Sequence, residues 1–214
     1  MRVAILAGGV EPDLEFCLAA LQAADRVICA DGGFALALQL GWVPDLVVGD
    51  LDSLGSEELH QLHRLGIPLQ QSPPEKDQSD LELAIQAAAA WGATEVHLLG
   101  ALGGRTDHML FNLVACLSYC HRLGLPAHVL SSHTEARLVV DRWDISGRGG
   151  WLCSLLSLSE ETVEVHLEGF LYPLAGETLH RHSSRGLSNR IQSDPARIRI
   201  RSGLLLAVLT PPGA

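Results

Sequence analysis

The first 132 residues alternate short apolar runs with longer stretches of helical pattern. The apolar runs are predicted to be strands and lie in residues 3–9, 26–33, 45–50, 67–72, 95–102 and 126–132. The helical patterns lie in residues 13–25, 34–41, 56–66, 79–92 and 106–124. Strands that are apolar throughout and lead into helices are typical of a parallel sheet covered on both faces. We therefore predict an α/β domain with a Rossmann-like parallel sheet over residues 1–132.

The ends of several predicted helices carry recognisable signals. Ser79 and Glu82 have the S-x-x-E spacing of a capping box. Ser56 and Thr106 are expected to be the N-caps of their helices. Glycines are expected to end four of the helices, at Gly41, Gly66, Gly92 and Gly124.

The pattern changes after about Ser132. Short segments follow at residues 135–141, 151–159, 162–169, 196–203 and 204–210. Many of them alternate apolar and polar residues, Gly or Pro separates them, and no helix is expected. Residues 146–151 read as a turn. We predict a C-terminal antiparallel β-sandwich over residues 133–214.

Composition narrows the classes of function. The chain has 214 residues, 47% of them hydrophobic, and a formal net charge of −10. This acidity argues against nucleic acid as a partner, and no apolar run reaches the ~20 residues of a membrane span. The five cysteines contain no C-x-x-C pair. We expect them to be reduced and buried in a cytoplasmic protein, and the N-terminus does not resemble a signal peptide.

Acidic residues and glycines follow the predicted strands or precede helices. They lie in AGG (7–9), ADGG (30–33), GDLDS (49–53), KDQSD (76–80) and GALGGRTDH (100–108). Ligands of an open parallel sheet bind outside the carboxyl ends of its strands, so these acids are predicted to converge on one cleft.

Converging acids repel one another, by about 1 kcal/mol for a pair ~4 Å apart in water and roughly 4 near a protein surface. Such a cluster needs a counter-ion, and Mg²⁺ shared with substrate phosphates is the simplest. Each acid also has a structural alternative as a cap or turn residue. For Asp80 the helix dipole alone would favour the charge.

The glycine-rich segment 100–108 suits a phosphate. Its backbone can approach an anion closely, and the following helix offers free N–H groups while Arg105 supplies a guanidinium. A tight strand–helix turn is the alternative. The segment is neither a P-loop nor a dinucleotide fingerprint, which disfavours P-loop kinases and nicotinamide enzymes. Neither a G-x-S-x-G elbow nor a zinc-binding pattern is present in the sequence.

Taken together, the motifs resemble the thiamine pyrophosphokinase family. ADGG, PDLVVGDLDS, KDQSDLELAI and GALGGRTDHMLFNL follow the order and spacing of its catalytic domain. SLLSLS, GFLYPL and GLSN resemble its C-terminal thiamine-binding domain. The resemblance implies an α/β domain followed by a β-sandwich, Mg²⁺ as cofactor, and transfer of a pyrophosphoryl group from ATP to thiamine. It also implies a homodimer with thiamine bound at the subunit interface.

The resemblance assigns roles to individual residues. The catalytic set is Asp50, Asp52, Asp77 and Asp80, of which Asp50, Asp52 and Asp80 would hold the metal. The ATP-binding set is Asp31, Gly32, Gly33, Arg105, Asp107 and His108, and the thiamine-binding pair is Ser188 and Asn189. The acid that assists deprotonation of the hydroxyl is left open.

Three departures and two competing functions remain. Ser79 replaces a usual threonine, and Leu171 and Arg190 replace residues that are commonly polar or charged. An aromatic wall for thiamine could come from Trp143 or Trp151, for which packing is the alternative. The competing functions are a diphosphokinase acting on another alcohol, such as a hydroxymethylpterin, and a nucleotide-sensing module without turnover.

Overall fold

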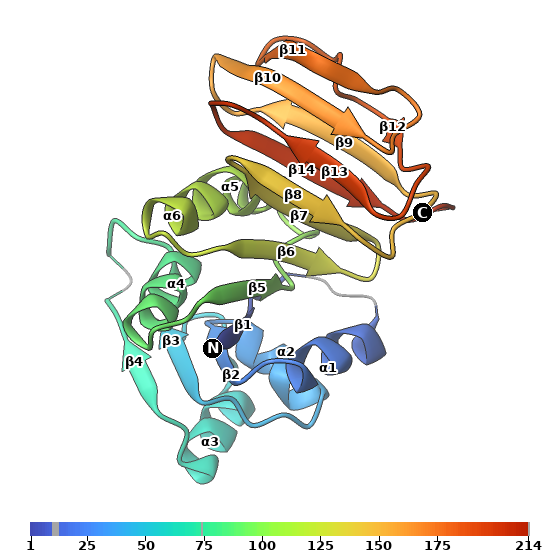
Figure 1. Ribbon diagram of the computed structural model, residues 1–214. Helices are drawn as coiled ribbons and strands as arrows, with labels where there is room; N and C mark the ends of the chain where they lie inside the picture. The colour runs from blue at the N-terminus through green and yellow to red at the C-terminus, as the bar shows by residue number, and fades with distance from the viewer. Residues whose placement is uncertain (10–12, 74, 214) are drawn as a thin grey trace. The chain divides into compact units, whose positions relative to one another are not determined.

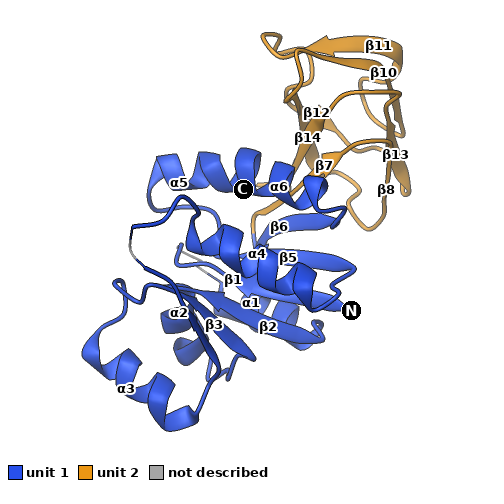
Figure 2. Cartoon of the chain, turned by 90° about the vertical axis from the view of Figure 1, so that its left-hand side faces the viewer, with its two compact units in different colours: residues 1–132 blue, residues 133–214 orange. Residues whose placement is uncertain are grey.

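The computed structural model describes residues 1–9, 13–73 and 75–213 (Figure 1). The chain divides into two units, Met1–Ser132 and His133–Ala214 (Figure 2). Unit 1 is built on a parallel sheet with helices, and unit 2 consists of antiparallel sheets. The fold class predicted from the hydrophobic pattern is therefore confirmed. No helix in the described part of the chain is long and apolar enough to cross a membrane.

The sheet of unit 1 has the strand order β6-β5-β1-β2-β3-β4, and its pairs are parallel (Figure 1). Its strands are β1 (Arg2–Leu6), β2 (Arg26–Ala30), β3 (Leu46–Gly49), β4 (Leu69–Gln71), β5 (Glu95–Leu99) and β6 (Ala127–Ser131). The next strand along the chain, β2, pairs with one edge of β1, and the later strand β5 pairs with its other edge. The order thus reverses between β1 and β5, which is the place where open α/β sheets bind ligands.

Helices cover this sheet because its strands are apolar on both faces. They are α1 (Leu14–Gln22), α2 (Gly33–Gln39), α3 (Ser56–Leu65), α4 (Asp80–Ala90), α5 (Thr106–Phe111) and α6 (Leu117–Arg122). Buried residues of α1, α2 and α3, among them Leu21, Phe34 and Leu62, share one core with β1, β2 and β3. Helix α4 also lies against these three strands and buries Leu81 and Ile85.

Two predicted helix starts are wrong by one residue, and the third is confirmed. The N-cap of α3 is Gly55 rather than Ser56, and that of α5 is Arg105 rather than Thr106. In both places the extended backbone falls one residue earlier, so the hydroxyl residue is already helical and makes no capping bond. Ser79 caps α4, and its capping box with Glu82 is complete.

The helix predicted over residues 106–124 is not regular. A π-helical segment, η1 (Asn112–Cys116), separates α5 from α6. The apolar spacing did not reveal it, because one widened turn changes the hydrophobic period only locally.

The loops that follow β1, β2 and β5 approach one another backbone to backbone. A Cβ atom on Gly33, the first residue of α2, would lie 2.0 Å from the carbonyl oxygen of Leu6 in β1. A Cβ atom on Gly9 would lie 2.2 Å from the carbonyl oxygen of Gly100. Only glycine fits at these contacts, so the three loops are held close together at the carboxyl edge of the sheet.

The described residues of unit 2 form two antiparallel sheets, β12-β9-β14-β7 and β11-β10-β13-β8. The strands are β7 (Thr134–Val139), β8 (Arg142–Ile145), β9 (Leu152–Ser157), β10 (Glu161–Glu168), β11 (Leu174–His180), β12 (Asn189–Arg190), β13 (Ala196–Arg199) and β14 (Leu205–Thr210). Inward residues of both sheets, such as Cys153 and Ile198, share one core, as in a sandwich. The sequence pattern did not indicate β8, β11 or β12.

The cysteines are free and buried, as predicted. Burial raises the pKa of Cys116, Cys120 and Cys153 to about 12, so these thiols are poor nucleophiles.

The capping box of α4 is expected to contribute measurably to stability. Ser79→Ala removes the hydroxyl that accepts from the backbone N–H of Glu82, and we expect a loss of about 1 kcal/mol in urea unfolding. Ser56→Ala is the matched control, because Ser56 makes no capping bond, and it should change stability by less than ~0.5 kcal/mol. Equal losses in the two variants would contradict the assigned cap positions.

Candidate active site

A cleft of about 710 Å³ opens at the carboxyl edge of the sheet in unit 1. It lies beside the loops after β1, β2, β3 and β5 and beside the start of α4. Four of the acids expected to converge, Asp31, Asp50, Asp80 and Asp107, line this cleft. Its lining also includes Gly8, Gly9, Gly32, Ser53, Lys76, Gly103, Gly104, Arg105, His108 and Asn112.

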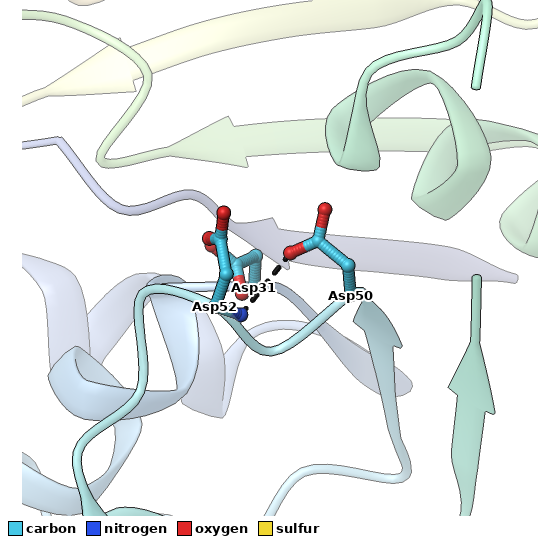
Figure 3. Close-up of side chains that lie close together, drawn as sticks. All are labelled: Asp31, Asp50 and Asp52. Atoms are coloured by element: carbon cyan, nitrogen blue, oxygen red, sulfur yellow. Dashed lines mark hydrogen bonds between the residues drawn. The ribbon is translucent and has the colours of Figure 1, made fainter. Parts of the chain in front are cut away.

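Asp31, Asp50 and Asp52 form a cluster of carboxylates (Figure 3). Each offers one oxygen, and these oxygens lie within 4.8 Å of one another. Asp31 follows β2, whereas Asp50 and Asp52 follow β3. The backbone is strained here, since Asp31 has φ +42° and Leu51 has φ +69°. The cluster thus brings carboxylates from two loops to one place.

The charges of the cluster perturb one another. The backbone N–H of Asp52 donates to Oδ1 of Asp50 at 3.1 Å, and this bond, with Lys76, holds the pKa of Asp50 below its usual value. The charge of Asp50 raises the pKa of Asp52. Oδ1 of Asp31 is buried and has no hydrogen-bond partner among the described residues. A buried carboxylate oxygen without a partner is costly unless a cation neutralises it.

The donor set fits Mg²⁺. This cation takes oxygen ligands at about 2.0–2.1 Å, so ligands on its opposite sides lie about 4.2 Å apart. One oxygen from each of the three carboxylates lies within 4.8 Å of the others, a spacing close to this distance. Asp31, Asp50 and Asp52 are therefore the residues that could hold a divalent cation.

Lys76 provides a positive charge next to this cluster. Its Nζ lies 3.1 Å from Oδ2 of Asp50 and 3.0 Å from Oδ1 of Asp80, and its side chain is only 15% exposed. Burial alone would lower the pKa of Lys76, but the ion pair with Asp80 and the hydrogen bond to Asp50 outweigh burial and raise this pKa. The pKa of Asp80 is raised, mainly by burial. Lys76 therefore stays charged and joins two acids of the cleft.

Arg105, Asp107 and His108 lie at the start of α5 and line the cleft, as expected for neighbours of a ligand. The guanidinium of Arg105 donates to Asp107 at 2.7 Å and lowers the pKa of that carboxyl to about 2. Both side chains are largely exposed, so this pair contributes little to stability. The guanidinium of Arg105 can therefore exchange the carboxylate of Asp107 for another anion.

Three further residues of the predicted site do not line the cleft. Asp77 is exposed, and its predicted part in catalysis stays a prediction. Asp52 adds a carboxylate to the cluster, and Gly33 is buried beneath the loops at the start of α2.

Ser188 and Asn189 belong to unit 2. Asn189 is buried, and its amide is bonded within the protein: Oδ1 accepts from the N–H of Tyr172 and Nδ2 donates to its carbonyl. Ser188 is exposed and has φ +59°. Asn189 thus fixes the segment around Tyr172. Trp143 is buried in the core of unit 2, and Trp151 is half-buried and packs against that core, in line with the packing alternative.

Sequence reasoning assigned no role to Lys76, Ser53 or Asn112. A signal existed for Lys76, which stands four residues before Asp80 in the KDQSD motif. Ser53 follows Asp52 in the GDLDS motif. Asn112 gives no signal by itself, because a single polar residue on a helix is common.

Comparisons with known proteins agree across both units. A model described as the thiamin pyrophosphokinase catalytic domain matches residues 17–125, and one described as the vitamin B1 binding domain of the same enzyme matches residues 144–205. A thiamine pyrophosphokinase of Bacillus subtilis (strain 168) is 26% identical over 183 residues, which cover 85% of each chain.

Solved structures give the same result. The crystal structure of thiamine pyrophosphokinase from Bacillus subtilis matches with a TM-score of 0.87 at 25% identity, covering 99% of this chain and 100% of that one. The enzyme from Geobacillus thermodenitrificans matches with a TM-score of 0.85 at 25% identity, covering 100% and 99%. Yeast thiamin pyrophosphokinase, at 15% identity, shares the fold with a TM-score of 0.81, covering 98% of this chain and 86% of that one. Because the catalytic-domain model alone spans more than half of the sequence, the chain belongs to the thiamin pyrophosphokinase family.

Proposed function

We propose that the cleft of unit 1 binds ATP together with Mg²⁺ and is where the pyrophosphoryl group is transferred. As a member of its family, the chain is a thiamine pyrophosphokinase, which transfers this group from ATP to the hydroxyl of thiamine and releases AMP. The observation that carries the proposed location is the gathering of carboxylates and the Lys76 ammonium in one cleft. Charge neutralisation and positioning are what phosphoryl-type transfer mainly requires.

We assign the metal to Asp31, Asp50 and Asp52. The unpartnered buried oxygen of Asp31 supports its inclusion, although the family resemblance placed it with the nucleotide. Mg²⁺, when bound by these carboxylates, would supply positive charge that offsets the negative charge developing as AMP leaves. The resemblance also placed Asp80 at the metal. Because Asp80 lies 3.0 Å from Lys76, we propose instead that it holds this ammonium next to the metal site.

The other lining residues are assigned to the nucleotide. We propose that Lys76 and Arg105 contact phosphate oxygens, since both cations line the cleft. The backbone of Gly32 and of the loop before α5 would lie against the nucleotide, with Asp107 and His108 beside it. Gly33 acts indirectly, because it lets the loops after β1 and β2 meet.

The thiamine end is assigned to unit 2. We propose that Ser188 contacts thiamine and that Asn189 holds the neighbouring segment in place, because its amide is already bonded to Tyr172. Tyr172 and Leu187 are 64% and 65% exposed, so both large side chains are available for contact with a ligand or a partner. This supports the proposal that two copies form a dimer with thiamine at their interface.

The substrate is tested by incubating the protein with ATP, Mg²⁺ and an alcohol. With thiamine we expect AMP and thiamine diphosphate in equal amounts, and with a hydroxymethylpterin we expect neither AMP nor a diphosphate product. AMP formed only with the pterin would favour the other diphosphokinase. Nucleotide binding without AMP for any alcohol would favour a sensing module.

Asp50→Asn and Asp52→Asn are each expected to lower kcat by about 10²- to 10³-fold, because each removes a charge from the proposed metal site. Circular dichroism should show that both variants stay folded. Asp141→Asn is the matched control, since Asp141 is exposed and lies in unit 2. Undiminished kcat in a folded Asp50→Asn or Asp52→Asn protein would remove that residue from the site.

The shared thiamine site predicts that turnover depends on association. We expect activity per chain to fall on dilution in parallel with dissociation measured by analytical ultracentrifugation. Leu187→Asp should weaken the dimer, because it places a charge on an exposed apolar position. A monomer that converts thiamine at the rate of the dimer would contradict the proposal.

A further inference from the structure

The loop between β5 and α5 has an unusually permissive backbone. Gly100, Gly103 and Gly104 have φ +62°, +77° and +67°. Glycine has more accessible backbone conformations than any other residue and loses more entropy when it is ordered, so a loop built on three glycines relies on bonds from outside to stay in one shape. Gly103, Gly104 and Arg105 of this loop line the cleft. The conformation of this loop therefore determines where the loop backbone and Arg105 lie in the cleft.

Asn112 supplies one such bond. Its Nδ2 donates to the carbonyl oxygen of Ala101 at 2.9 Å, and Ala101 is 3% exposed. The bond joins the helix to the buried base of the loop. The exposed tip at Gly103 and Gly104 then extends from a fixed base into the cleft.

The π-helical segment η1 begins at Asn112 and places a second bond on the same amide. The thiol of Cys116 lies 3.8 Å from Oδ1 of Asn112 and donates to it. This contact sets the orientation of the amide, because it assigns the oxygen to Cys116 and leaves the NH₂ group for Ala101. Isolated π-helical turns occur frequently at functional sites.

We propose that Asn112 is a positioning residue for the reaction and that Cys116 fixes its amide. Asn112 acts through the loop: it holds Ala101 so that the backbone of residues 102–105 and the side chain of Arg105 keep their places in the cleft. The consequence for ATP rests on the proposed function, whereas the ordering of the loop does not.

Amide hydrogen exchange of the full-length protein, without any ligand, tests the ordering. Asn112→Asp keeps the shape of the side chain but replaces the NH₂ donor with a second oxygen facing the carbonyl of Ala101. We expect the amides of residues 101–105 to exchange at least about threefold faster, the lower end of the effect of one hydrogen bond. Exchange in α4 should stay unchanged. Unchanged exchange of residues 101–105 in this variant would overturn the proposal.

Steady-state kinetics test the consequence for the reaction. In Asn112→Asp we expect the KM for ATP to rise by about threefold to tenfold, while the KM for thiamine stays within twofold of wild type. An equal rise of both constants would indicate a general structural defect and overturn the positioning role. Wild-type protein that does not turn over would defeat the proposed function, yet its exchange data would still decide the role of Asn112.

A second pair of variants keeps the test independent of the folding of Asn112→Asp. Cys116→Ala removes the thiol that contacts Asn112, and Cys116→Ser restores a donor. Cys120→Ala is the control, because Cys120 is also buried and lies in α6, whereas the thiol that contacts Asn112 in the described residues is that of Cys116. We expect Cys116→Ala alone to speed exchange in residues 101–105, by up to threefold. The same change in Cys120→Ala, or no change in Cys116→Ala, would contradict the role of Cys116.

Discussion

The candidate active site depends on compensating the electrostatic repulsion between its carboxylates. Asp31, Asp50 and Asp52 each place one oxygen within 4.8 Å of the others. The charges of Asp31 and Asp50 also contribute to raising the pKa of Asp80. Such an arrangement is unfavourable unless cations compensate it. Lys76 compensates Asp50 and Asp80 from within the chain. The buried oxygen Oδ1 of Asp31 has no hydrogen-bond partner among the described residues. A divalent ion that accompanies a nucleotide would neutralise its charge.

The fold of unit 1 maintains this arrangement against its electrostatic cost. Parallel strands direct the loops after β1, β2, β3 and β5 to one edge of the sheet, and the strand order reverses between β1 and β5. Glycine contacts such as that of Gly33 with Leu6 lock these loops together. The strained backbones of Asp31 and Leu51 are stabilised by the packing around them rather than by local preference. We infer that Asn112 similarly holds the glycine-rich loop before α5 in place, through its bond to Ala101.

Much of this could be predicted from the sequence because the signals are local. Apolar runs gave the strands of unit 1, the Ser79–Glu82 spacing gave a capping box, and acids after strands gave a common cleft. Features that depend on tertiary contacts were missed. The short strand β12 depends on pairing with β9, and the π-helical segment begins at Asn112, which bonds to the preceding loop. The contacts of Lys76 with Asp50 and of Asn189 with Tyr172 were missed for the same reason, since these partners are 26 and 17 residues away along the chain. The caps at Gly55 and Arg105 make no side-chain capping bond, so no residue pattern indicated them.

A crystal structure with Mn²⁺ and a non-hydrolysable ATP analogue tests the central claim most directly, because the anomalous signal locates the metal independently of the nucleotide. The account predicts a manganese peak within coordination distance of carboxylate oxygens of Asp31, Asp50 and Asp52, with the triphosphate between that peak and the loop before α5. A metal and triphosphate bound outside this cleft, with the three carboxylates contacting neither, would contradict it.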